Sequence, residues 1–290
     1  EFADLQGIAG RYYALHDGED PAVAAALEQQ YWPRFAGDRL PDNPVATTLA
    51  LAERLDTLAG IFGIGEIPTG SKDPFALRRA SLAVLRIIVE GQLDLDLDEC
   101  LGWATGNFED GVLDADTVPT ARDYMVERFR AWYEDENIPV EVFRAVSARG
   151  ITRPLDMHRR VHAVDSFRQL PEASALAEAN KRVSNILEKQ GSENKTLTVS
   201  KDLLTEPSEQ ALCAALQHQK SALDSLLESR DNGRQLSSLA QIPEPVDNFF
   251  EDVIVMVEDP AVRENRLALL ADLRALFLQV ADISQLAGSR

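Results

Sequence analysis

Cysteine and histidine are scarce in this sequence of 290 residues, which contains two cysteines and four histidines. Two thiols supply neither a disulfide framework nor the ligand spacing of a zinc site, so Cys100 and Cys213 are expected to be buried apolar residues in a reducing cytoplasm. No apolar run reaches the roughly 18 residues that a membrane helix needs. The composition therefore excludes a disulfide-stapled domain and a membrane-spanning chain.

Basic residues are also outnumbered, with 29 lysines and arginines against 48 acidic residues and a net charge of −19. Such a charge argues against sequence-blind binding to nucleic acid, and no DNA partner is expected. The bases gather locally, however: six arginines lie between Arg144 and Arg168, and five bases lie between Lys181 and Lys201. These bands can bind a polyanion at chosen points, and a solvated charged surface explains them equally well.

Strand signals are almost absent, while helical periodicity continues through most of the chain. Leu93, Leu95 and Leu97 alternate with aspartates, but aspartate disfavours strands, so a loop entering a helix at Asp98 is expected. The segment 102–120 is rich in Gly, Asn, Asp and Thr and predicts a domain boundary or a mobile loop. The last helix is expected to start after an N-cap at Asp259. The fold class is therefore predicted to be all-α.

The segment 60–90 combines a glycine-rich connector with a basic helix. Its part Gly65–Lys72 resembles a phosphate-binding loop, but the serine precedes the lysine and Pro68 removes a backbone donor. We therefore expect a turn, followed by a helix over 75–90 that Asp73 caps with Pro74 at its first position. The first residues, from Glu1 on, look like the middle of a longer sequence, so the chain is expected to be a fragment of a longer protein.

Two histidine patterns suggest metal chemistry. His16-Asp17, with Asp56 on a second helix, would be a partial metal site of the kind that HD-type phosphohydrolases use, although one doublet supplies too few ligands. The alternative is a polar helix end. His158 and His162 share a helix face, but arginines follow the first histidine where a zinc protease needs a glutamate, so a basic helix face is expected there.

The stretch Ala179–Leu187 combines apolar positions with Asn180, Lys181, Ser184 and Asn185. Cationic side chains position phosphates, and amides can read exposed base edges of RNA. An internal polar network that ties helix ends through the two asparagines is an equal alternative.

These segments carry a resemblance to a known family. The segments that carry the resemblance are 33–38, 60–90, 179–187, Phe249-Phe250, 255–257 and 277–284. Over essentially its whole length, the chain closely resembles the C-terminal portion of the β subunit of bacterial heterotetrameric glycyl-tRNA synthetase. The resemblance implies residues 1–65 as the end of a degenerate HD-like domain, 66–118 as a connecting helical segment and 119–290 as a DALR-type anticodon-binding helical domain.

The resemblance also implies how the work is divided. The α subunit carries the catalytic site, with ATP, Mg²⁺ and glycine, whereas the β subunit binds glycine tRNA; this part is expected to hold no catalytic residue, cofactor or metal. The alternatives are an HD-type metal-dependent phosphohydrolase and a pure scaffold for the α subunit. The residues expected to contact tRNA are Arg128, Arg130, Arg153, Arg159, Lys181, Arg182 and Asn185.

A second group is expected to meet either the tRNA backbone or the α subunit, namely Lys72, Arg78, Arg79 and Arg86. Intramolecular pairing of these arginines with Asp73, Asp56 or Glu90 explains them at least as well.

Overall fold

The computed structural model describes all residues except 1, 71, 193–196, 228–230 and 289–290. The predicted all-α fold is confirmed in this part, which contains α-helices and three short 3₁₀ helices but no strand. The 3₁₀ helices are η1 (Ala3–Leu5), η2 (Lys201–Leu203) and η3 (Ile283–Leu286). None of the described helices is long and apolar enough to cross a membrane.

The chain divides into two compact units, one formed by residues 1–135 and 152–158 and the other by 136–151 and 159–290. The boundary thus passes through α8 (Pro154–Phe167). The predicted three-part division at residues 65 and 118 stays a prediction.

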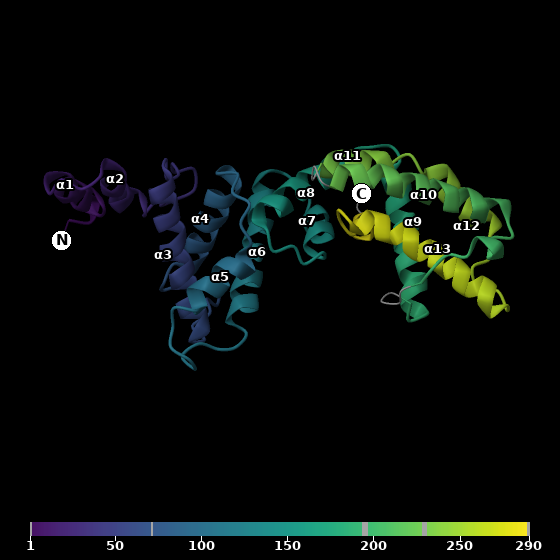
Figure 1. The fold of residues 1–290 in the computed structure, drawn as a ribbon, viewed down its shortest axis with the longest axis horizontal. Coiled ribbons are helices and arrows are strands. Elements are labelled where there is room, and N and C mark those ends of the chain that lie inside the picture. The colour runs from purple at the N-terminus through teal and green to yellow at the C-terminus, as the bar shows by residue number, and fades with distance from the viewer. Residues whose placement is uncertain (1, 71, 193–196, 228–230, 289–290) are drawn as a thin grey trace. The chain divides into compact units, whose positions relative to one another are not determined.

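In the first unit, α3 packs against α2, α4, α5 and α6, and α1 packs against α2 (Figure 1). The core between these helices contains Leu58, Phe62, Leu85, Ile88 and Phe129, each at most 2% exposed. The helices of this unit are α1 (Ile8–His16), α2 (Pro21–Gln29), α3 (Pro44–Gly63), α4 (Leu77–Glu90), α5 (Leu97–Thr105) and α6 (Thr117–Asp135).

The segment 102–120, predicted to be a domain boundary or a mobile loop, is helical at both ends. Helix α5 continues to Thr105 and α6 begins at Thr117, so only the residues between them form a loop. This loop lies against α3: the backbone N–H of Asp114 donates to Gly63 O at 2.8 Å, and Phe108 and Leu113 contact α3 at its glycines. Two apolar residues therefore anchor a segment whose composition predicts little order.

The start of α4 also differs from its prediction. The helix begins at Leu77 rather than at residue 75, after Ala76 in a left-handed conformation (φ 56°), so Pro74 does not occupy its first position as predicted. Asp73 still caps it, because its carboxylate accepts from the N–H groups of Leu77 at 2.8 Å and Arg78 at 3.0 Å. A tight turn with a bridge between Thr69 and Lys72 precedes it; Ser71, part of the apparent phosphate loop, lies outside the described residues.

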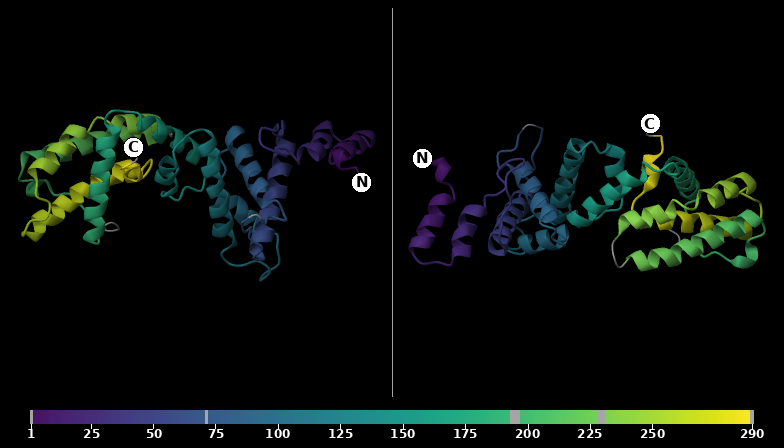
Figure 2. Two further views of the ribbon diagram at one scale, coloured as in Figure 1. Left: turned by 180° about the vertical axis from the view of Figure 1, so that it is seen from behind. Right: turned by 90° about the horizontal axis from the view of Figure 1, so that it is seen from above.

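In the second unit, α13 packs against α9, α10 and α11, and α12 packs against α9 and α10 (Figure 2). Asp259 caps α13 as predicted, accepting from Ala261 N at 2.9 Å. In the first unit, the predicted loop entering α5 is also confirmed; the helix begins at Leu97 rather than at Asp98, and Asp96 is its cap. The helices of the second unit are α7 (Val140–Ser147), α9 (Ala173–Lys189), α10 (Pro207–Leu227), α11 (Asn232–Leu239), α12 (Pro243–Asp252) and α13 (Pro260–Leu278).

Candidate nucleic-acid interface

One exposed face of α9 gathers three of the predicted tRNA contacts. The helix buries Leu176, Val183 and Leu187, and the opposite positions face solvent because they follow the helical repeat. An open hollow of about 560 Å³ lies along this side. We call these residues the α9 face: Glu178, Lys181, Arg182, Asn185, Ile186 and Lys189.

The three cations of the α9 face outnumber its one carboxylate, Glu178. Within the described chain, Lys181 and Lys189 take part in no ion pair. The Arg182 guanidinium lies 4.2 Å from the centre of the Phe250 ring on α12. Stacking on an aromatic face holds a guanidinium in place while its N–H donors at the edge stay available. The α9 face thus presents donors suited to phosphate oxygens.

The two asparagines of this helix have different surroundings. Asn180 is 2% exposed, and its Nδ2 donates to Leu176 O at 3.0 Å within the helix. Asn180 is therefore an internal polar residue, but it bonds within its own helix instead of tying helix ends as predicted. Asn185 is exposed on the α9 face, so its amide can donate and accept hydrogen bonds from outside.

Other predicted tRNA contacts lie elsewhere. Arg159 is exposed on α8 in the second unit. Arg130 belongs to the first unit and forms ion pairs along α6 with Glu127 at 3.1 Å and Glu134 at 3.3 Å. Such exposed pairs contribute little stability, so Arg130 can exchange these partners at low cost.

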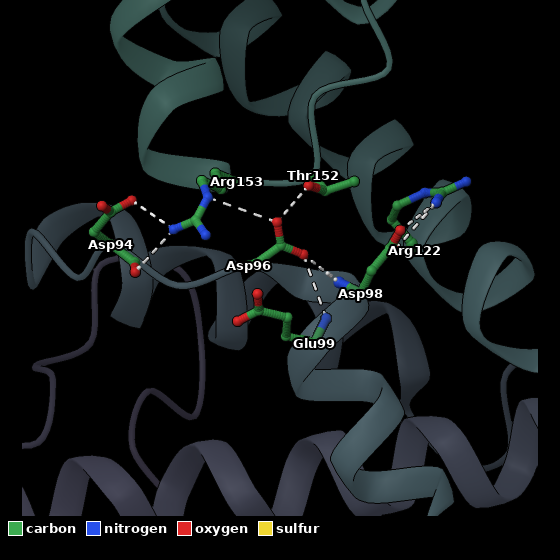
Figure 3. A network of polar contacts seen from close by, with 7 residues as sticks. All are labelled: Asp94, Asp96, Asp98, Glu99, Arg122, Thr152 and Arg153. Carbon is green, nitrogen blue, oxygen red and sulfur yellow. Dashed lines mark hydrogen bonds and ion pairs between the residues drawn. The ribbon is translucent and has the colours of Figure 1, made fainter. Parts of the chain in front are cut away.

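Arg153 belongs to a polar network at the start of α5 (Figure 3). Its Nη1 donates to Asp94 Oδ1 at 3.1 Å, and its Nε lies 3.6 Å from Asp96 Oδ2. Thr152 Oγ1 also donates to Asp96, at 2.6 Å. Arg122 lies at the far side of the network and pairs with Asp98 at 2.8 Å. The guanidinium of Arg153 thus has a structural role, and its contact with RNA stays a prediction.

The carboxylate of Asp96 has a lowered pKa in this network. Burial acts to raise its pKa, but the hydrogen bonds from Thr152 and from the backbone N–H groups of Glu99 and Asp98, with the charge of Arg153, outweigh burial and hold the pKa below its ordinary value. Asp96 is therefore ionised when it caps α5.

At the contact of α4 and α6, Arg78 and Arg128 lie around Tyr124. Arg78 donates to the carbonyl of Gly70, and the Arg128 guanidinium lies 4.7 Å from the Tyr124 ring centre. Among the residues that the structure describes, the buried Tyr124 hydroxyl and Arg128 Nε have no hydrogen-bond partner. Burial raises the pKa of Tyr124, so this hydroxyl is neutral and able to donate.

The other three members of the second predicted group are Lys72, Arg79 and Arg86, and they differ in whether they form ion pairs. Arg86 pairs with Glu90 at 2.6 Å and donates to Asp38 O at 2.9 Å, so the predicted intramolecular alternative is confirmed for Arg86. Lys72 and Arg79 are exposed, and neither forms an ion pair with any described residue.

Sequence reasoning missed Arg54, which is only 7% exposed on α3. Its Nη1 donates to Gln30 O at 2.6 Å and to Ala50 O at 2.8 Å, and no described carboxylate pairs with it. Burial lowers the pKa of the Arg54 guanidinium. The available signal was its position between Leu51, Leu55 and Leu58, on the apolar side of a predicted helix.

The possible metal ligands do not gather. His16 and Asp17 are exposed at the end of α1, and Asp56 is exposed on α3. Across the described residues, no three His, Cys, Asp or Glu side chains are placed to hold a metal ion. Both cysteines are buried and free, as predicted, and burial raises the pKa of each thiol.

Comparison with known proteins gives two family matches. The model of the glycyl-tRNA synthetase beta subunit matches residues 1–148, and the model of the DALR anticodon binding domain matches residues 176–283. The glycine–tRNA ligase beta subunits of Marinobacter nauticus and Chromohalobacter salexigens are each 55% identical over 286 residues, and that of Haemophilus influenzae is 52% identical. These alignments cover 99% of this chain and 41% of each relative.

Proposed function

The chain belongs to the family of the glycyl-tRNA synthetase beta subunit, and we propose that it is a tRNA-binding part of such a subunit. It would support the ATP- and Mg²⁺-dependent attachment of glycine to tRNA in the cytoplasm. The catalytic residues and cofactors of that reaction would belong to the α subunit, the protein partner. The chain spans about 41% of the length of the relatives it matches.

The α9 face is the observation that supports this proposal most directly. It lies inside residues 176–283, the segment that resembles a DALR anticodon binding domain. It joins cations that form no ion pair with a described carboxylate to an exposed amide at Asn185. Lysine and arginine position an RNA strand through its phosphates, whereas an amide can distinguish the edges of unpaired bases. The face is thus suited to a single-stranded loop such as the anticodon loop.

The acidic remainder of the chain would make binding more selective, because it disfavours unrelated nucleic acids. A net charge of −19 repels polyanions over most of the surface, so binding is favoured only where local cations outnumber acids. Phosphate contacts at the α9 face would then give affinity without strong binding to unrelated nucleic acid.

Two substitutions on the α9 face test the division of roles. Lys181→Ala should weaken binding to every tRNA alike and reduce the slope of log affinity against log salt by about 0.7 to 0.9, because one phosphate contact is lost. Asn185→Ala should instead reduce the preference for the glycine anticodon by about 1–3 kcal/mol, the range for a well-formed bidentate base contact. Fluorescence anisotropy of labelled tRNA measures both quantities.

Lys220→Ala is the matched control, because Lys220 is an exposed lysine on α10 of the same unit. It should leave affinity and salt slope unchanged. Equal effects of the Lys181 and Lys220 substitutions would show that the α9 face holds no phosphate. A chain that binds the α subunit and leaves tRNA free would instead be an assembly scaffold.

A further inference from the structure

A pocket of about 400 Å³ in the first unit has no role in the function proposed above. It lies between the start of α4, the middle of α3 and the segment that follows α2. We call it the Arg54 pocket; the residues that matter in its lining are Tyr31, Arg34, Glu53, Arg54, Phe75 and Arg79. Its volume falls within the range of about 300–1,000 Å³ typical of small-molecule sites.

The pocket carries more positive than negative charge. Arg34 is paired with Asp38 at 3.3 Å, and the carboxylate of Glu53 lies in the lining. Arg54 is buried and donates to two backbone carbonyls, and neither Arg54 nor Arg79 forms an ion pair with a carboxylate in the part of the chain that the structure describes. A buried cation is costly without a counter-charge, so an anion in this pocket would be stabilised by two guanidinium groups.

The N-terminus of α4, which lies beside the pocket, does not supply the donors for an anion. The N–H groups of Leu77 and Arg78 have no carbonyl partner within α4 because they lie in its first turn. Both donate to the Asp73 carboxylate, at 2.8 Å and 3.0 Å, so they are not available to an anion in the pocket. The capacity to hold an anion therefore comes from the side chains of Arg54 and Arg79.

Two aromatic side chains also line the pocket and provide rings on which a flat ligand can stack. Tyr31 and Phe75 both line it, and Phe75 is 47% exposed. Exposed aromatic rings beside arginine are the combination with which proteins hold unpaired bases, since each base has a flat face that stacks on a ring while its phosphate meets the cation. A simple carboxylate ligand would use the arginines and leave the rings unused.

We propose that the Arg54 pocket binds one unpaired nucleotide of an RNA strand, with its phosphate at Arg54 and Arg79 and its base on Phe75 or Tyr31. The assignment of RNA as the source of this nucleotide rests on the proposed function. The pocket would provide a contact with tRNA in the first unit, in addition to the α9 face of the second.

The test is an NMR titration of the 290-residue chain carrying Lys181→Ala and Arg182→Ala, so that the α9 face does not compete. Adenosine 5′-monophosphate and a short single-stranded oligoadenylate serve as ligands, with adenosine, inorganic phosphate and a glutamate-rich peptide as comparisons. The signals to follow are the Arg54 Nε–H and the ring of Phe75. Saturable shifts of both signals with the two nucleotide ligands, stronger than with adenosine or phosphate alone, are expected.

Arg79→Ala should weaken nucleotide binding about tenfold, the effect of losing one charged hydrogen-bond partner. It should weaken binding of glycine tRNA to the otherwise unsubstituted chain in the same direction. Arg149→Ala is the matched control, because Arg149 is also exposed and has no ion pair among the described residues; it should change neither. Arg54→Lys keeps the charge without the planar fork, and it should weaken binding while preserving the fold.

The two proposals fail in different ways. If the unsubstituted chain binds tRNA through the α9 face but nucleotides leave the Arg54 and Phe75 signals unmoved, the pocket proposal is wrong and the proposed function stands. If nucleotides bind while tRNA does not, the pocket stands and the proposed function is wrong. Shifts caused by the glutamate-rich peptide and by no nucleotide would assign the pocket to a protein partner and overturn the proposal.

Discussion

At the scale of single residues, ion pairing shows which cations have a structural role and which are available to bind a ligand. The chain has 48 acidic and 29 basic residues, and many of the described arginines pair with a carboxylate, as Arg86 does with Glu90 and Arg122 with Asp98. Cations that lack one, such as Lys181 and Arg79, are therefore the informative exceptions. Exposed ion pairs add little to stability, so the pairing mainly decides which donors are open to a ligand.

One ion pair of the second unit is buried, so removing only one of its partners should be strongly destabilising. Arg266 Nε donates to Glu209, whose side chain is completely buried, and Glu209 also accepts from Glu206 N at 2.9 Å. Glu209→Leu leaves the arginine charge buried without a partner, which should cost about 3–5 kcal/mol. Urea unfolding followed by circular dichroism measures the loss.

The double variant Glu209→Leu with Arg266→Met is the matched control for this pair. Removing both charges should restore most of the stability, because an apolar pair of similar size avoids the desolvation cost. A double variant as unstable as Glu209→Leu would mean that packing, rather than the unpaired charge, determines the loss.

Asp96 should make stability depend on pH in the acid range. Its folded-state pKa lies below the ordinary value of 3.8, so its contribution is complete above the unfolded-state pKa and is lost as the pH falls through the folded value. Asp96→Asn should lower the free energy of unfolding by about 1 kcal/mol at pH 7, through weaker bonds to Thr152 and Arg153.

The difference between the wild-type chain and Asp96→Asn should shrink as the pH falls below about 4, the window that the lowered pKa sets. Asp110→Asn, at an exposed position, should show no such pH dependence. A constant difference from pH 7 to the acid end of the titration would rule out an ionised Asp96 as the source.

At the scale of elements, the sequence predicted helices well and their connections poorly. The helix after Asp259 could be predicted because its cap and apolar stripe are local signals. The loop after α5 could not, because its order depends on Leu113 meeting α3 at Gly63, a contact distant in the chain. The same applies to Arg54, because its hydrogen bond to the carbonyl of Gln30, the residue after α2, joins segments that are distant in the chain.

A methyl group at Gly63 tests this contact between elements. A Cβ there would lie 2.5 Å from Leu113 Cδ2 and 2.8 Å from its Cβ. Gly63→Ala should therefore destabilise the first unit by about 1–3 kcal/mol through overpacking. Thermal unfolding of the variant measures the effect.

Gly102→Ala gives the control, because Gly102 is exposed in α5 with no atom within 4 Å of an added Cβ. It should be neutral or stabilise by up to about 1 kcal/mol through helix propensity. Equal stability of the two variants would mean that the loop moves away from α3 without cost.

At the scale of the whole molecule, the two compact units divide the candidate RNA contacts between them. The second unit carries the α9 face, within the segment that resembles an anticodon binding domain. The first carries the Arg54 pocket and the cations of α4. The sequence resemblance was sufficient to predict the family, whereas the available surfaces emerged only from the side chains that the fold leaves unpaired.

The binding of glycine tRNA to the 290-residue chain tests the proposed function most directly. Fluorescence anisotropy should show saturable, salt-dependent binding that is weaker by about 1–3 kcal/mol for each altered anticodon base. Equal affinity for tRNA with the native and the altered anticodon, or binding that does not change with salt, would contradict an anticodon-reading role for this chain.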